Sequence, residues 1–252
     1  MGNCKACTRR ELESLIGILQ HACKVIQPGR SFLRRAISLL SITKQPHHHI
    51  RLNAEFRSDI KWWKAFAAHW NGAAVLAIPE QHSLLLTSDA SGSWGCGAWH
   101  ATHWFQLEWS PTTRDWNIAA KELLPIVIAA VIWRHLWQGR QVIARCDNAA
   151  VVAVLNSRYS KDKHMMHLLR CVFFAEAYGN FKLVAVHLPG SHNVLADDLS
   201  RNRLYSFRMQ FPESDTSPTS IPSSLLQWLS STDLDWTSPA WIQLFNTTVA
   251  RV

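Results

Sequence analysis

From residue 83 onward the chain alternates strand-like and helix-like segments in an order that few folds accommodate. Three short strand patterns come first, joined by tight glycine or polar turns that favour an antiparallel meander. The full series is a strand at 83–90, strands at 94–101 and 103–110, a helix at 117–137, a strand at 141–147, helices at 149–157 and 164–179, a strand at 181–190 and a helix at 193–202. The order β-β-β-α-β-α-α-β-α predicts an α/β fold, a mixed five-stranded sheet flanked by helices.

Size and hydropathy are consistent with such a fold. The chain has 252 residues, of which 48% are hydrophobic, enough to bury a substantial core. No segment offers 18 uninterrupted apolar residues, and the charged start lacks the apolar centre of a secretory signal. We therefore expect an intracellular protein, cytoplasmic or nuclear, with no membrane partner.

Four acidic residues fall at the ends of the expected elements. Asp89 and Asp147 each end a strand, Glu122 lies in the early turns of the long helix, and Asp197 lies in the last helix. Ligands of open α/β sheets bind at the carboxyl ends of strands, and the meander with one crossover places two of these strand ends side by side. Converging carboxylates repel one another unless hard divalent cations lie between them. Two Mg²⁺ ions about 4 Å apart can activate water and stabilise a leaving oxygen in phosphodiester hydrolysis.

The sequence around these acids resembles a known family. The segments TSDAS, AAKELLPI, RCDNAAVV and HLPGSHNVLADDLSR together resemble the ribonuclease H domain of retroelement reverse transcriptases. The resemblance is greatest to DIRS-like retrotransposons with tyrosine recombinases, and it covers residues 83–203. It implies a ribonuclease H-like fold and cleavage of the RNA strand of an RNA/DNA hybrid.

The resemblance also implies roles for single residues. Asp89, Glu122, Asp147 and Asp197 match the carboxylates that bind two Mg²⁺ ions, for which Mn²⁺ can substitute. Asp197 rather than Asp198 takes this role, because the family pattern is A-D-x-L-S-R, in which a small residue is common at the position of Asp198.

Three further residues are expected at this site. His187 stands ten residues before the last aspartate, like a loop histidine that assists proton transfer or product release in the family. Read alone, a histidine at a strand end is more often half-buried and structural. Asn193 matches a loop asparagine of structural appearance, and we expect Asn148 and Asn193 among the residues that contact nucleic acid.

The positive charge is concentrated at the start of the chain. Residues 1–72 hold 12 Lys and Arg against 4 Asp and Glu, whereas residues 73–252 hold 14 of each. The same region shows helical apolar spacing in segments 9–26, 31–41 and 54–70. We expect a small basic helical bundle that faces a polyanion, or one whose charges only solvate its surface.

This bundle resembles the thumb and connection that precede ribonuclease H in the same elements. The resemblance implies contacts with the duplex backbone, to which we assign Arg30, Arg34 and Arg35. We expect Trp62, Trp63 and Trp70 to pack in a core or between domains rather than to stack on bases. No Y-x-D-D turn of a polymerase palm occurs. The chain therefore looks like an excerpt of a polyprotein whose other parts, the palm and the recombinase, are its expected partners.

The two ends of the chain carry weaker signals. The pair Cys4 and Cys7 could bind zinc, but no second tightly spaced pair accompanies it, and an unstructured start is the simpler interpretation. Residues 204–252 are rich in Ser, Thr and Pro and indicate a tail or linker with short amphipathic pieces at 225–229 and 241–245. The predicted organisation is thus a helical segment at 1–72, a ribonuclease H-like domain at 83–203 and this tail.

Three functions remain open from the sequence. The first is a two-metal ribonuclease H. The second is an inactive or domesticated fragment that binds nucleic acid without cutting it, against which the four intact acidic positions argue. The third is another nuclease or transferase on the same fold, such as an integrase-like relative with three carboxylates. Asp197 and the loop of His187 discriminate against this third hypothesis.

Overall fold

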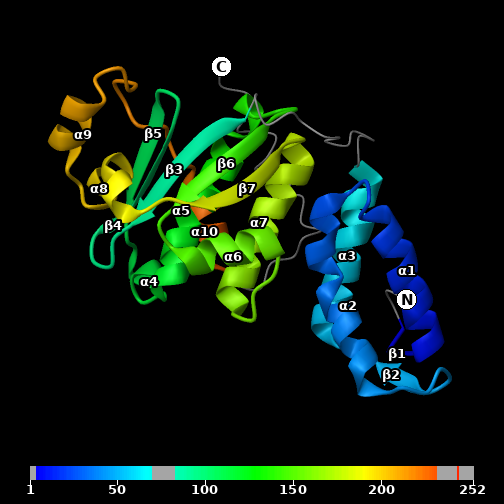
Figure 1. Ribbon diagram of the computed structural model, residues 1–252. Coiled ribbons are helices and arrows are strands. Elements are labelled where there is room, and N and C mark those ends of the chain that lie inside the picture. The colour runs from blue at the N-terminus through cyan, green and yellow to red at the C-terminus, as the bar shows by residue number, and fades with distance from the viewer. Residues whose placement is uncertain (1–3, 70–82, 232–242, 244–252) are drawn as a thin grey trace. The chain divides into compact units, whose positions relative to one another are not determined.

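A computed structural model describes residues 4–69, 83–231 and 243 of the chain (Figure 1). The described residues fall into two compact units, one built on 4–69 and the other on 83–231, and each is considered by itself. The domain boundaries expected from the sequence stay predictions. No helix among the described residues is long and apolar enough to cross a membrane.

The first unit is a helical bundle with a small sheet. Its elements are β1 (Ala6–Thr8), α1 (Arg9–Ala22), a 3₁₀ helix (Gln27–Phe32), α2 (Arg34–Leu39), a 3₁₀ helix (Leu40–Ile42), β2 (His49–Arg51) and α3 (Ala54–His69). Thr8 begins α1 with a capping box, in which its hydroxyl accepts from the Glu11 amide and the Glu11 carboxylate accepts from the Thr8 amide. The predicted helical bundle is thus confirmed.

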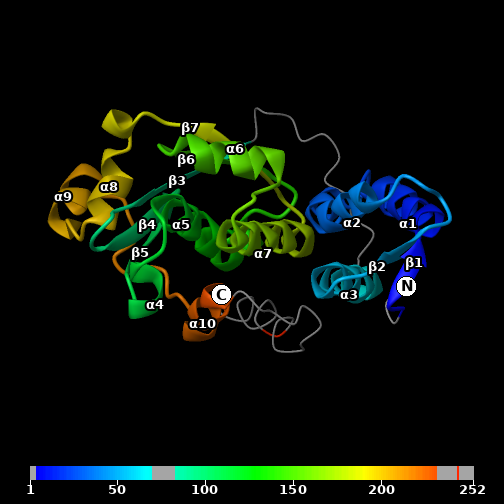
Figure 2. The ribbon, with the colours of Figure 1, turned by 90° about the horizontal axis from the view of Figure 1, so that it is seen from below.

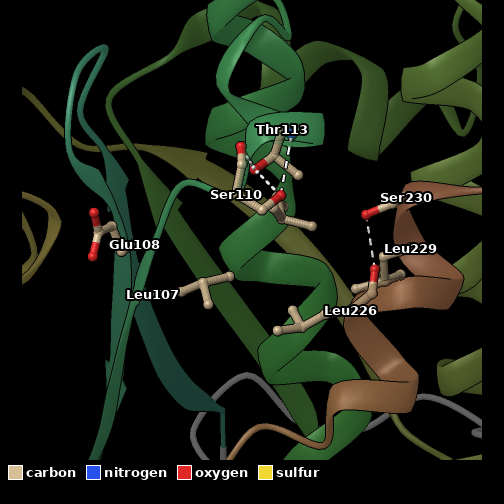
Figure 3. A pocket seen from close by; sticks show the side chains of 8 residues that line it. Leu107, Glu108, Ser110, Thr113, Leu226, Leu229 and Ser230 are labelled. Carbon is tan, nitrogen blue, oxygen red and sulfur yellow. Dashed lines mark hydrogen bonds between the residues drawn. The ribbon is translucent and has the colours of Figure 1, made fainter.

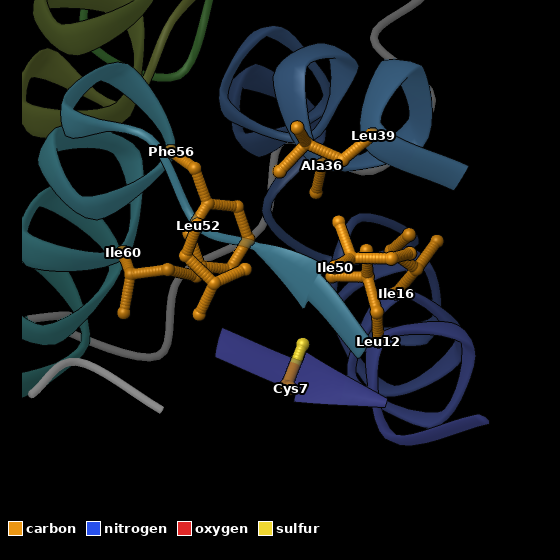
Figure 4. Close-up of a cluster of buried hydrophobic side chains, with 9 residues drawn as sticks. All are labelled: Cys7, Leu12, Ile16, Ala36, Leu39, Ile50, Leu52, Phe56 and Ile60. Atoms are coloured by element: carbon orange, nitrogen blue, oxygen red, sulfur yellow. The ribbon is translucent and has the colours of Figure 1, made fainter. Parts of the chain in front are cut away.

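The apolar faces of the three helices meet over the small sheet (Figure 4). The core consists of Cys7, Leu12, Ile16, Ala36, Leu39, Ile50, Leu52, Phe56 and Ile60. Trp62 is fully buried and stacks on Phe32 with ring centroids 3.8 Å apart, and Trp63 is also buried. These two tryptophans therefore pack in the core as expected, whereas Trp70 lies outside the described residues.

Two expectations for this unit were wrong. The start of the chain is not unstructured from residue 6, because Ala6–Thr8 pairs antiparallel with His49–Arg51 and buries Cys7. The second helix is interrupted, with α2 flanked by two 3₁₀ segments. Cys4 is exposed, and neither it nor Cys7 belongs to a group of possible metal ligands in the described part of the chain.

The second unit is built on a mixed five-stranded sheet of order β5-β4-β3-β6-β7. Its strands are β3 (Leu84–Ala90), β4 (Gly95–His100), β5 (His103–Glu108), β6 (Gln141–Cys146) and β7 (Lys182–His187). The first three pair antiparallel, and β6 and β7 add in parallel beyond β3. This is the mixed five-stranded sheet that the order of segments predicted.

Helices flank this sheet, as Figures 1 and 2 show. They are α4 (Pro111–Arg114), α5 (Ile118–Ile132), α6 (Ala149–Ser157), α7 (Lys163–Gly179), α8 (Val194–Ser200), α9 (Leu204–Gln210) and α10 (Ser223–Ser230). Both α5 and α8 pack against β3 and β4, and α7 packs on α5. Side chains of both α5 and α8 therefore lie against the central strand β3.

The long helix α5 begins as predicted but ends earlier. The Asn117 side chain accepts from the Ala120 amide at 2.8 Å and caps its first turn. The helix stops at Ile132 rather than Trp137, and a 3₁₀ turn (Arg134–Leu136) follows. One cause is the buried Arg134, whose guanidinium donates to the Val131 carbonyl that a continuing α-helix would use.

Residues 204–230 pack on the sheet unit to an extent that their composition did not indicate. Phe207 of α9 is fully buried against Trp104 and Leu199. The amphipathic piece at 225–229 is confirmed as part of α10, with Leu225 and Leu229 buried. The aromatic and leucine side chains outweigh the Ser/Pro-rich composition here, because burying each stabilises by about 2 kcal/mol. The piece at 241–245 lies almost wholly outside the described residues.

Candidate active site

Asp89 and Asp147 meet at the carboxyl end of two neighbouring parallel strands. The pairing of β3 with β6 runs from Leu84 opposite Val142 to Thr87 opposite Arg145. Continuing this register by two residues sets Asp89 beside Asp147. The charge of Asp147 raises the pKa of Asp89, as expected for two carboxylates in one site.

Asp89 is held from two sides by residues far along the chain. Its Oδ2 accepts a 2.6 Å hydrogen bond from the Ser200 hydroxyl, and its Oδ1 accepts one of 3.4 Å from Asn193 Nδ2. The same amide donates to the Ser88 carbonyl at 3.0 Å. Asp89 is only 5% exposed, and burial raises its pKa to about 6. The two hydrogen bonds therefore fix the Asp89 carboxylate in position, while burial makes its charged form unfavourable.

Glu122 lies in α5 and reaches the same strand ends. It is buried, accepts a hydrogen bond from the Ala90 backbone, and lies 3.9 Å from Cys146 Sγ. Burial first, and then the charges of Asp89 and Asp147, raise the pKa of Glu122 to about 9. In the metal-free protein Glu122 is thus protonated at neutral pH.

Asp197 on α8 completes the predicted set of four. Its charge acts on Asp89, whose pKa it raises. Its own two oxygens are bonded to Arg201, at 2.6 Å, and to Arg203. The neighbouring Asp198 is turned away into the fold, where it is buried and bonded to Arg203 and Gln210. The structure therefore brings all four predicted carboxylates to one end of the sheet.

The close approach of α8 depends on a glycine. Gly97 on β4 lies directly opposite Asp89, and a Cβ at this position would come within 2.4 Å of Leu199 Cβ. A residue with a side chain would push α8 off the sheet, because protein cores leave no room for such overlap. Gly97 thus allows α8 to carry Asp197 and Ser200 to the strand ends.

The other predicted site residues lie around this cluster with distinct surroundings. His187 ends β7, and its Nε2 lies 3.1 Å from the Asp147 carbonyl. Asn148 caps α6 through Oδ1, which accepts from the Ala150 and Val151 amides. Asn193 is 1% exposed and positions Asp89, so burial leaves it little access to a bound strand. The contacts of Asn148 and Asn193 with nucleic acid stay predictions.

The donor set suits hard divalent cations. Ligand atoms of Glu122, Cys146 and Asp147 lie within 4.8 Å of one another, the spacing that one bound ion requires. Burial raises the pKa of the Cys146 thiol, which leaves the carboxylates as the available anionic donors. The raised pKa values of Asp89 and Glu122 also favour a cation site, because a bound cation would offset the repulsion between these buried negative charges. Within this group, the carboxylates of Glu122 and Asp147 therefore offer two oxygen donors at a spacing that fits one Mg²⁺.

The three arginines of the helical unit that are predicted to bind phosphate differ in exposure. Arg30 and Arg34 are exposed. Arg35 is one-third exposed and bonds Asp59 at 3.2 Å as well as the Glu55 carbonyl at 3.1 Å. Because Asp59 is buried, Arg35 has a structural contact to keep.

A pocket elsewhere in the second unit does not include any of the four predicted carboxylates. Figure 3 shows it between β5, α4 and α10, lined by leucines such as Leu107, Leu226 and Leu229. Ser110 caps α4 at its edge. None of the predicted site residues lines this pocket.

Sequence reasoning missed Ser200, Arg201 and Arg203, all of which contact the aspartates. A signal existed, since Ser200 and Arg201 follow Asp197 by three and four residues. Residues at this spacing lie on the same face of a helix.

Comparisons with known proteins found similar solved structures but no family model and no curated relative. No family model matches the chain, and no curated protein matches it. Among solved structures, a foamy viral protease-reverse transcriptase in complex with double-stranded DNA matches 72% of this chain and 34% of its own, at 14% identity and a TM-score of 0.34. A second such complex matches 74% and 42%, at 11% identity and a TM-score of 0.31. A mutant of the prototype foamy virus protein matches 71% and 24%, at 13% identity and a TM-score of 0.29.

The chain spans less than half the length of each of these structures. The order and pairing of the strands in this molecule define its fold.

Proposed function

We propose that the sheet unit is a ribonuclease H that hydrolyses the RNA strand of RNA/DNA hybrids within the reverse transcriptase polyprotein of a DIRS-like retroelement. The observation that carries the proposal is the convergence of Asp89, Glu122, Asp147 and Asp197 at one end of the sheet. The pKa of two of these four carboxyls is raised by burial and by the charge of the neighbouring acids. Such perturbed acids are typical of functional sites.

In this function the four carboxylates hold two Mg²⁺ ions. Bound there, the ions supply an activated water and a stabilised leaving oxygen. Asp89 is central, because its pKa responds to both Asp147 and Asp197. Ser200 and Asn193 fix its carboxylate, which preserves the geometry that the reaction needs.

His187 has a separate role in the proposal. It lies beside the Asp147 backbone at the exposed end of β7, where it can reach solvent and a bound strand. An imidazole at this place can take part in proton transfer through its ring nitrogens. We assign it to proton transfer or product release.

Substrate choice gives the direct test. The full chain is incubated with Mg²⁺ and a hybrid labelled on either strand, beside double-stranded RNA and double-stranded DNA of the same sequence. We expect cleavage of the RNA strand of the hybrid alone, because only a 2′-hydroxyl separates that strand from DNA. Equal cutting of duplex DNA would instead indicate another nuclease on this fold. Binding of hybrid without any cutting would indicate the inactive alternative.

A further inference from the structure

Arg201 and Arg203 bind the two oxygens of Asp197, one of the four carboxylates that the proposed function assigns to metal binding. Arg201 Nε donates to Asp197 Oδ1 at 2.6 Å, and Arg203 donates to Oδ2. Both oxygens of Asp197 thus face a guanidinium. Each oxygen of Asp197 accepts from one guanidinium, so about half of its lone-pair sites are occupied. The two positive charges also weaken the attraction of this carboxylate for a divalent cation, and moving one arginine away would strengthen Asp197 as a metal ligand.

The side chains of Arg201 and Arg203 lie where they can move away from Asp197 into solvent. Their side chains are 53% and 47% exposed, whereas that of Asp197 is 29% exposed. Ion pairs this open to water contribute little stability, so their exchange for another anion costs little. Among the described residues, the side chain of Arg201 bonds Asp197, while Arg203 also bonds the buried Asp198 through Nε at 2.6 Å. Arg201 is therefore the freer of the two to move.

A nucleic-acid phosphate is the anion that suits these side chains. The guanidinium fork binds phosphate oxygens in pairs, as it binds a carboxylate. A phosphodiester that approaches four carboxylates also needs positive charge beside it. Arg201 already lies close enough to Asp89 for the two charges to interact. In the free protein it acts as a counter-charge for the acidic cluster.

We propose that Arg201 and Arg203 bind a backbone phosphate of the nucleic acid and that this contact releases Asp197, so that nucleic acid and divalent cation load the site together. The inference rests on the proposed function and adds a coupling between its two ligands. Coupling of this kind is reciprocal, so each ligand raises the affinity for the other by the same factor. The alternative is that both arginines only stabilise α8, in which Arg201 follows Asp197 by one helical turn.

The test measures metal binding rather than activity. Mn²⁺ binding to the full chain is measured by calorimetry, alone and with a saturating hybrid whose RNA strand carries 2′-O-methyl groups and cannot be cut. We expect the hybrid to tighten Mn²⁺ binding by wild type at least fivefold. Arg201→Gln should bind Mn²⁺ more tightly than wild type without hybrid, and the effect of the hybrid should shrink. Lys24→Gln, an exposed position in the other unit with the same change of charge, should behave like wild type.

Equal Mn²⁺ affinity in wild type and Arg201→Gln, with an unchanged effect of the hybrid, would overturn the proposal. Arg203→Gln serves as a second variant, and its unfolding is measured because Arg203 also joins α8 to the chain after it through Asp198. No step of this experiment needs cleavage. A protein that fails to cut hybrid can therefore still show or lack the coupling, which separates the two proposals.

Discussion

The hydroxyl of Ser200 donates a 2.6 Å hydrogen bond to the carboxylate of Asp89 across 111 residues of sequence. This bond ties the last helix of the predicted motif to the central strand of the sheet. It favours the charged form of Asp89, whereas burial favours the neutral form. The balance between these effects sets both the stability of the metal-free protein and the readiness of the site for a cation.

Removing the bond tests this balance. Ser200→Ala should raise the pKa of Asp89 further and lower the hybrid-cleavage rate at neutral pH, shifting the pH-rate profile to higher pH. Loss of a buried hydrogen bond to a carboxylate should also cost about 1–3 kcal/mol of unfolding free energy. Ser206→Ala, which removes an exposed hydroxyl on α9 that accepts from Gln210, is the matched control. A Ser200→Ala profile identical to that of wild type would refute the role.

The pH dependence of stability has a definite sign. The pKa of Asp89 rises from 3.8 to about 6 on folding, and that of Glu122 from 4.5 to about 9. The stability that these protonated groups contribute is complete below about pH 4. It is lost as pH rises through about 6 and then through about 9, on the order of 3 kcal/mol for Asp89.

Thermal unfolding in EDTA at pH 4 and pH 7 measures this effect, because the interval spans the pKa values of Asp89 in the unfolded and folded states. We expect wild type to lose more stability than Asp89→Asn over this interval, because the variant lacks one of the buried ionisations. Mg²⁺ should stabilise wild type more at pH 7 than at pH 4. Parallel curves for the two proteins in EDTA would contradict the assignment of the pKa values.

The packing of α8 gives a steric prediction. Gly97→Ala places a methyl group 2.4 Å from Leu199 Cβ, so α8 must move and carry Asp197 and Ser200 with it. We expect a loss of about 1–3 kcal/mol in urea unfolding, as for other overpacked cores, and a large loss of cleavage. Gly92→Ala is the control, since nothing lies within 4 Å of its Cβ. Normal cleavage by Gly97→Ala would show that α8 is not held as described.

The sequence alone predicted much of this site, and the reason is local. Asp89 and Asp147 end strands whose apolar patterns are readable, so their place at the strand ends followed from the sheet order. The partners of Asp89 were not readable. Ser200 and Asn193 reach it through tertiary packing over 111 and 104 residues, which no local pattern encodes.

Local patterns also misled where a buried side chain overrode them. The helix pattern of α5 ran on to Trp137, but the helix ends at Ile132, where the buried Arg134 side chain bonds the Val131 carbonyl. The Ser/Pro-rich composition after residue 203 suggested a linker, but Phe207 is buried in the core. In both cases the packing of one large side chain decided the local structure.

The helical unit gives a prediction on nucleic-acid binding. Replacing the exposed Arg30 and Arg34 by Gln should weaken hybrid binding for all sequences and reduce the slope of log affinity against log salt by just under one unit for each lost phosphate contact. Turnover at saturating hybrid should change little, because the four carboxylates lie in the other unit. An unchanged slope would mean that these arginines only solvate the bundle.

Arg35 should behave differently from its neighbours. Its bond to the buried Asp59 makes Arg35→Gln destabilising, by about 1–3 kcal/mol for a hydrogen bond to a charged group. Urea unfolding of the full chain measures this loss. Arg35 is therefore left unchanged in the variant that neutralises Arg30 and Arg34, and unfolding of Arg30→Gln, at an exposed position, is the control for Arg35→Gln.

The central claim is that the buried acids form a metal-dependent catalytic site, and the rate of hybrid cleavage by wild type and Asp89→Asn tests it most directly. Wild type should cut the RNA strand with Mg²⁺ and stop on addition of EDTA. Asp89→Asn should fold with undiminished metal-free stability, because one repulsion is gone, yet cut at least about a thousandfold more slowly, since metal coordination supplies several kcal/mol of transition-state stabilisation. Near-normal cleavage by folded Asp89→Asn would contradict the account.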